Sequence, residues 1–162
     1  MEKSYIGDVV LGASDGLVTT FAVVAGVAGA GLSPSVIIIL GFAKLVADAL
    51  SMAAGVYLGH ESEEEALRRT TTHTPRKSAA FTFAAFVGLG AVPLLPYLFA
   101  LTSTQAFWLA SVLTGLTIFA VGSARTIVTR RPWFSSGIEM LFITSLAAAV
   151  AFIIGRLLGS QV

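Results

Sequence analysis

Five long apolar runs, separated by short polar segments, dominate the hydrophobic pattern of this chain. Each run is long enough to cross a bilayer as an α-helix, which takes about 20 residues. The pattern therefore predicts an all-α integral membrane protein with five transmembrane helices in a single domain, residues 1–162. The predicted helices cover about residues 9–32, 36–59, 79–101, 106–128 and 137–158.

Short turns and one longer polar segment separate the runs. Pro34 suits the first turn of a helix, and Trp133 lies where an aromatic side chain would anchor a helix end at the membrane surface. Pro93 and Pro96 predict a kink or a shaped helix end in the third run. The turns are expected at residues 31–34, 101–105 and 130–134, and a cytoplasmic loop is expected at residues 60–77.

The basic residues predict the orientation of the chain in the membrane. With the five predicted crossings, eight of the ten Lys and Arg residues fall on the side of the N-terminus, and only Arg156 falls on the opposite side. Under the positive-inside rule, the N-terminus is then cytoplasmic and the C-terminus lies outside. The residues on the cytoplasmic side are Lys3, Arg68, Arg69, Arg76, Lys77, Arg125, Arg130 and Arg131.

Composition excludes several functional classes. Of the 162 residues, 56% are apolar and 12% are charged, so part of the surrounding solvent must be lipid. The net charge of +1 argues against a nucleic-acid partner. The absence of cysteine excludes disulfides, thiolate metal sites and thiol catalysis. No catalytic motif lies in an aqueous segment, so an enzyme is not expected.

The first two runs carry ionisable residues inside apolar sequence. Lys44, Asp48 and Met52 follow one another at intervals of four and share one face of a helix; we call them the polar stripe. Asp8 and Asp15 lie seven residues apart, on nearly one face of the first helix. A charge within a bilayer is costly and faces a partner, a cavity or a pathway. The carboxylates and the thioether are candidate metal ligands, since oxygen suits hard ions and sulfur adds preference for softer transition metals.

Helical geometry predicts how these residues meet. If the first two helices form an antiparallel hairpin, residues at equal depth have numbers that sum to about 67. Asp15 is then level with Met52, Asp8 is level with His60, and Asp48 lies near the middle of the membrane. Two copies of Asp15 and Met52 would make a four-ligand site for Fe(II) or Mn(II), with Asp15 able to exchange metal for a proton. The residues expected to collect cations at the cytoplasmic mouth are His60, Glu61, Glu63, Glu64 and Glu65.

Each of these groups also has a structural interpretation. Met52 could fill the core. Lys44 and Asp48 could form a self-neutralising pair, or Lys44 could serve in proton coupling. Residues 60–77 could be a solvated helical extension with pairs between Glu and Arg. A scaffold or packing protein would be a third functional class, and it is expected to lack a polar cavity around Asp15.

Small residues at intervals of four indicate where helices approach one another closely. They occur in the first run at Gly12 and Gly16, and in the second along a ridge that we call the α2 ridge. Both sets could pack within one subunit or form the seam of a homodimer, since five helices alone enclose a polar path poorly. The α2 ridge consists of Ala43, Ala47, Ser51, Gly55 and Gly59.

Several of these motifs resemble the vacuolar iron transporter family, whose members are proton-coupled Fe(II) and Mn(II) exporters. Residues 8–17 (DVVLGASDGL) are similar to the first-helix motif of that family, with two acids seven apart. Residues 49–58 (ALSMAAGVYL), followed by Glu61-Ser-Glu63, resemble its second-helix signature. Residues 93–98 and 136–159 look like parts of its third and fifth helices.

The resemblance implies a homodimer of five-helix subunits, with a metal path between subunits lined by the first two helices. It places Asp8, Asp15 and Met52 on that path. Two departures are Lys44, where the family usually has glutamate, and Asp48, where it has a small residue. The segment at 60–77 also looks too short for the metal-binding domain that some members insert there.

The expected function is therefore proton-coupled export of Fe(II) or Mn(II) from the cytosol, with no permanently bound cofactor. The expected partners are a second copy of the chain, lipid and divalent metal ions. The expected location is the cell membrane of a prokaryote or a vacuolar-type membrane of a eukaryote. The alternative is a family member with another substrate or no transport, in which Lys44 neutralises the site.

Overall fold

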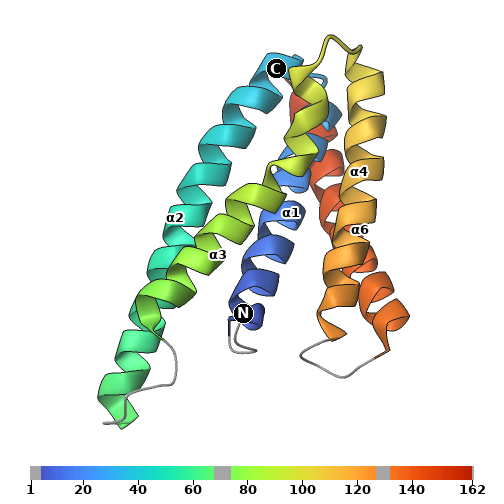
Figure 1. The fold of residues 1–162 in the computed structure, drawn as a ribbon. Coiled ribbons are helices and arrows are strands. Elements are labelled where there is room, and N and C mark those ends of the chain that lie inside the picture. Colours follow the sequence, from blue (N-terminus) through green and yellow to red (C-terminus); the bar gives the residue numbers. More distant parts are fainter. Residues whose placement is uncertain (1–4, 68–73, 127–131, 162) are drawn as a thin grey trace.

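The computed structural model describes residues 5–67, 74–126 and 132–161, and within these ranges the regular structure is entirely helical. The chain starts and ends at opposite ends of an elongated helix bundle (Figure 1). The helices are α1 (Ile6–Gly29), α2 (Pro34–Leu67), α3 (Pro75–Gly90), the 3-10 helix η1 (Val92–Leu98), α4 (Ser103–Ala124) and α6 (Trp133–Gly159).

The helices have the length and surface of an integral membrane protein. Helices α1, α2, α4 and α6 are each long and apolar enough to cross a membrane, and α3 with η1 is a bent pair that would give a fifth crossing. Large apolar side chains cover the outside of the bundle, where Trp108, Leu116 and Phe142 are 65%, 66% and 68% exposed. Such a surface is stable against lipid and unfavourable in water. The part of the chain that the structure describes is thus that of an all-helical membrane protein, with four to five candidate spans.

Helix α2 is longer than the sequence pattern predicts. It continues as one helix to Leu67, past the predicted end at residue 59, so the described start of the segment at 60–77 is helical. Glu and Ala are strong helix formers, and this favours continuation beyond the apolar run. The structural interpretation of this segment, a helical extension, is thus correct up to residue 67, and the expected pairs with Arg68 and Arg69 lie outside the described residues.

The predicted turn between the first two helices is confirmed. Gly31 has φ +70°, a left-handed conformation that glycine adopts without steric cost. Its N–H donates to the carbonyl of Ala28, and the N–H of Leu32 donates to Val27, which closes the C-terminus of α1. Pro34 is the first residue of α2, as expected from its fixed φ.

The predicted break near the two prolines is also confirmed. Helix α3 stops at Gly90, and the chain continues through Ala91 into η1 with a bend of 40° between the two axes. Pro93 and Pro96 lack the N–H that an α-helix needs, and both are buried in η1. At the next turn, Thr102 and Gln105 cap α4 reciprocally through their side chains and backbone N–H groups.

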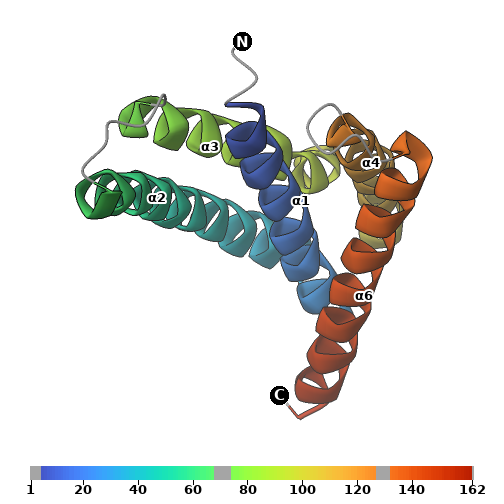
Figure 2. The ribbon, with the colours of Figure 1, turned by 90° about the horizontal axis from the view of Figure 1, so that it is seen from below.

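Helix α1 occupies the centre of the subunit (Figure 2). It packs against α3 on one side and against α6 on the other, more extensively than any other element does. Gly12 and Gly16 let its backbone approach the backbone of α3 at Thr82 and Phe86. These glycines therefore serve packing within one subunit, which settles one of the two alternatives for the small residues of α1.

Helix α2 rests mainly on α3 and makes fewer contacts with α1. The two helices meet near their shared turn and diverge toward the other end of the bundle (Figures 1 and 2). The space between them is therefore bounded by α3 on one side. The simple hairpin assumed from the sequence is thus modified by a third helix.

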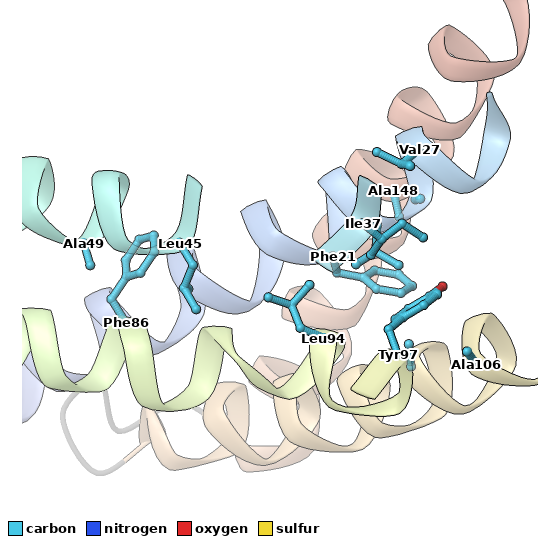
Figure 3. Close-up of a cluster of buried hydrophobic side chains, with 13 residues drawn as sticks. Phe21, Val27, Ile37, Leu45, Ala49, Phe86, Leu94, Tyr97, Ala106 and Ala148 are labelled. Carbon is cyan, nitrogen blue, oxygen red and sulfur yellow. The ribbon is translucent and has the colours of Figure 1, made fainter. Parts of the chain in front are cut away.

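The main hydrophobic core joins the five helices α1, α2, α3, α4 and α6 with η1 (Figure 3). Phe86 of α3 and Leu45 of α2 lie at one end of it, and Leu94 and Tyr97 of η1 lie toward the other. Partly buried apolar side chains, including Met52, pack against its edge. The fully buried members of the cluster, each under 3% exposed, are Val24, Ala25, Leu45, Ala49, Phe86, Leu94, Ala106 and Ala110.

Candidate functional site

The two carboxylates of α1 lie beside the contact between α1 and α3. Asp8 and Asp15 are half-buried, whereas Gly12 and Gly16, on the adjoining face, are buried against α3. The hydroxyl of Thr19, one turn further along, donates to the backbone carbonyl of Asp15 at 2.7 Å. This bond satisfies the Thr19 hydroxyl within α1 and does not involve the Asp15 carboxylate.

The polar stripe of α2 contains a short ion pair. Lys44 Nζ lies 2.6 Å from Asp48 Oδ2, and the two side chains are 26% and 43% exposed. The ammonium nitrogen itself is buried, and it lies 5.9 Å from the centre of the Phe86 ring. A ring face attracts a cation, so Phe86 adds to the stabilisation that Asp48 provides.

Helices α1 and α2 bring three ionisable groups into one electrostatic cluster. Lys44 and Asp48 both interact electrostatically with Asp15 across the boundary between the two helices. Phe86 forms the wall behind this cluster, because Gly16 packs on its backbone and Lys44 lies over its ring. The cluster therefore has packed protein on the side of α3.

Lys44 is oriented toward Asp48, along its own helix. The pair of Lys44 with Asp48 that the sequence offered as a structural interpretation is therefore formed. Met52, one turn further along α2, is half-buried and packs against the main core. Its structural interpretation as a core side chain is therefore correct in part, and its role as a metal ligand stays a prediction.

A depression of about 370 Å³ lies where α1 begins and α2 leaves the apolar region. It brings Asp8 together with His60 and Glu63, the neighbourhood expected from residues at equal depth. Glu61 accepts a hydrogen bond from the Tyr57 hydroxyl at 3.1 Å. The candidate residues of the mouth therefore occupy a helix at the edge of an open hollow, and Glu64 and Glu65 lie on the same extension.

The ionisable residues form a line along α1 and α2. Within residues 5–67, 74–126 and 132–161, no three His, Asp or Glu side chains come close enough together to hold a metal ion. The line starts at the depression beside Asp8 and continues to the cluster at Asp15 and the ion pair of α2. Met52 lies between these two groups along α2.

The α2 ridge faces outward, beside the polar stripe. All five of its small residues are exposed, and a Cβ atom added at Gly55 or Gly59 would have no neighbouring atom within 4 Å. The residues of the stripe follow those of the ridge directly in sequence, so they border it on the helix surface. This edge of the line of ionisable residues is thus uncovered in a single subunit.

Sequence reasoning missed Phe86 and Tyr57. Phe86 takes part because α3 packs against both α1 and α2, and nothing in its local sequence signals that contact. Tyr57 could have been found, since it lies four residues before Glu61 on the same helix. Trp133, the expected interfacial anchor, is 59% exposed at the start of α6 and meets Phe119 and Phe134 edge to face.

These features define a helical membrane protein with a line of ionisable and thioether side chains along two spans. A family model described as the VIT family matches residues 6–74 and 66–156. The chain belongs to this family. The two matches meet at residues 66–74, within the segment expected to lack the inserted domain.

Individual relatives agree with this assignment. The chain is 27% identical to Vacuolar iron transporter 1 of Eucalyptus grandis over 208 residues, covering 91% of this chain and 84% of the relative. It is 32% identical to Vacuolar iron transporter homolog 3 of Arabidopsis thaliana over 167 residues, covering 94% and 82%. The first alignment is longer than the 162-residue chain, so that relative has additional residues within the aligned region.

Proposed function

We propose that the protein exports a divalent transition-metal ion, Fe(II) or Mn(II), from the cytosol in exchange for protons. The observation that carries this proposal is the electrostatic cluster of Asp15, Lys44 and Asp48 on two membrane-spanning helices. Ionisable residues at such positions mark ion pathways. The names of the relatives, which describe vacuolar iron transporters, support iron as the cargo.

The proposed ligands combine oxygen and sulfur. Asp8, in the depression at the mouth, receives the ion, and Asp15 with Met52 binds it within the membrane. This set suits a borderline divalent ion, because the thioether selects against purely hard ions such as Mg²⁺. The half-buried Asp15 carboxylate can hold either the metal or a proton, which provides the exchange.

The path is proposed to lie between two copies of the chain. The exposed α2 ridge supports this arrangement, since small residues let two backbones approach closely in lipid. A second copy on this ridge would cover the uncovered edge of the polar stripe, which would otherwise face hydrocarbon. Each ligand would then occur twice, so that two Asp15 and two Met52 side chains surround one ion.

The proposed export direction is supported by the distribution of basic residues between the two ends of the bundle. The start of α3 and the end of α4, with Arg76, Lys77 and Arg125, lie at the same end of the bundle as the start of α1 (Figure 1). The positive-inside rule makes this end cytoplasmic, so the mouth beside Asp8 opens to the cytosol. The corresponding membrane is the cell membrane of a prokaryote or a vacuolar-type membrane of a eukaryote.

A second candidate function is favoured by the ion pair of α2. Lys44 places a positive charge within electrostatic range of Asp15, and an ammonium in the path repels a divalent ion. In this case the chain transports another substrate or none, and Lys44 closes a metal path. The two candidates differ in what happens when the lysine is replaced.

The test is metal flux into proteoliposomes under an imposed pH gradient. We compare the wild type with Asp15→Asn, Lys44→Glu and a control, Ser111→Ala, whose hydroxyl bonds only within α4 among the described residues. We expect gradient-dependent uptake of Fe(II) and Mn(II) by the wild type and the control, and a loss of at least about tenfold in Asp15→Asn.

The other outcomes separate the candidates. Flux in Lys44→Glu without flux in the wild type would favour the second function. Flux that Asp15→Asn leaves unchanged would remove Asp15 from the path. The absence of flux in all four proteins, each shown to be folded by gel filtration, would refute the exporter proposal.

A further inference from the structure

The two members of the Lys44–Asp48 ion pair differ in how far they are exposed. Lys44 Nζ is buried and, within the part of the chain that the structure describes, its polar contact is Asp48 Oδ2 at 2.6 Å. Asp48 is more exposed than Lys44, at 43% against 26%. The carboxylate thus lies nearer the uncovered side of α2, and the ammonium lies behind it against Phe86.

This ion pair neutralises the charge of one carboxylate, that of Asp48, in each subunit. A buried ammonium that lost its partner would be strongly unfavourable, so Lys44 holds Asp48 while the helix is intact. The pair remains within electrostatic range of Asp15, which has no cation on its own helix. Each subunit therefore offers the path one uncompensated carboxylate at this depth, that of Asp15.

The charge of the complete site follows from this count. Two subunits would contribute two Asp15 carboxylates and two neutral pairs, which gives a net charge of minus two. One divalent ion neutralises that charge. Without the lysine the same site would carry minus four, and each uncancelled carboxylate would strengthen cation binding by about tenfold or more in a partly dehydrated site.

We propose that Lys44 determines the charge selectivity of the metal path. Its ion pair with Asp48 leaves the site with a negative charge that one divalent cation neutralises, and this charge disfavours trivalent cations. This inference rests on the proposed function, since it concerns the same path. A site more negative than its cargo binds too tightly and favours ions of higher charge. Lys44 therefore allows a second acidic residue, Asp48, to lie in the path without the site binding the metal ion too tightly to release it.

Charge-balanced variants test the inference by binding alone. The full-length protein in lipid nanodiscs is titrated with Mn²⁺ and, separately, with the trivalent ion Tb³⁺, whose luminescence reports binding. The proteins compared are the wild type, Lys44→Met, Asp48→Asn, the double variant Lys44→Met/Asp48→Asn, and Lys44→Arg as a charge-preserving control.

We expect Lys44→Met to bind Mn²⁺ about tenfold or more tightly, with a larger gain for Tb³⁺ because Coulomb energy scales with ion charge. The double variant restores the net charge of minus two, so its affinities and its preference for Mn²⁺ should return toward those of the wild type. Asp48→Asn, which leaves the ammonium uncancelled, should bind both ions more weakly. Lys44→Arg should retain wild-type selectivity.

The outcomes that overturn the inference are distinct from those that overturn the function. Binding of Mn²⁺ by all five proteins without any change in Lys44→Met would overturn the inference alone. A double variant that stays as selective for Tb³⁺ as Lys44→Met would do the same. If no protein binds Mn²⁺, including the folded wild type and Lys44→Arg, the proposed function fails and this inference fails with it.

Discussion

Three glycine-to-leucine substitutions test which surfaces of the subunit are packed inside it and whether the α2 ridge faces the proposed second copy. Gly16 lies on α1 against α3, Gly55 lies on the α2 ridge, and Gly88 lies on the exposed side of α3. All three are helical, so leucine improves helix propensity at each by a similar amount, about 1 kcal/mol. Differences among the three variants therefore report the surroundings of each position.

The structure gives the size of each effect. A Cβ at Gly16 would lie 2.5 Å from the Phe86 carbonyl oxygen and 3.1 Å from its Cα, which are backbone atoms that cannot move aside. Forcing α1 away from α3 costs about 1–3 kcal/mol or more by the usual range for overpacking. At Gly55 and Gly88 no atom lies within 4 Å, so neither substitution disturbs the isolated subunit.

The assay combines thermal stability with oligomeric state in the same detergent. We expect Gly16→Leu to lower the melting temperature by several degrees, at about 2–4 °C for each kcal/mol. Gly55→Leu should remain folded but lose the proposed dimer, which light scattering coupled to gel filtration would detect in the wild type and not in this variant. Gly88→Leu should behave like the wild type in both measurements.

Two results would refute this reasoning. A Gly55→Leu protein as dimeric as Gly88→Leu would mean that the α2 ridge is not the seam of the dimer. A Gly16→Leu protein as stable as the wild type would mean that the close contact between α1 and α3 does not hold the subunit together. The first result would also remove the proposed position of the metal path.

Two further predictions concern Asp8, at one end of the line of ionisable residues, and Phe86, which lies behind the central cluster. Asp8→Asn should raise the KM for Mn²⁺ uptake severalfold and leave kcat nearly unchanged, because Asp8 lies in the entrance depression and not in the central cluster; an equal fall in kcat would place Asp8 deeper in the path. Phe86→Ala should destabilise the fold by about 3–5 kcal/mol, because a fully buried ring is lost; Phe86→Leu, measured by the same thermal melt, should lose much less, and equal losses would contradict this packing argument.

The parts of the fold that depend on local chemistry could be predicted from the sequence. Gly31 and Pro34 specify the first turn through their own backbone preferences, and Pro93 and Pro96 specify the break by lacking N–H groups. The apolar runs specify the spans because a bilayer accepts only long apolar helices. In each case the deciding property belongs to the residue itself or to its immediate neighbours.

The parts that depend on packing between helices could not be predicted. The spacing of Gly12 and Gly16 indicates a close approach but not its partner, and that partner is α3 within the same subunit. The depth rule for α1 and α2 placed Asp8 near His60 correctly, yet it could not include Phe86, which comes from a third helix. The pair of Lys44 and Asp48 was expected as an alternative, because i and i+4 positions meet on any helix.

The unbroken course of α2 has a mechanical consequence. Its 34 residues form a rod about 50 Å long, which exceeds the roughly 30 Å of bilayer hydrocarbon. Glu63, near the C-terminal end of α2, lies three turns beyond Met52 and within about 20° of it around the helix axis. With no hinge between them, a rotation of α2 that turns Met52 toward or away from a partner subunit turns Glu63 by the same angle. Under the proposed function, capture of an ion at the mouth and its binding inside the membrane would then change together.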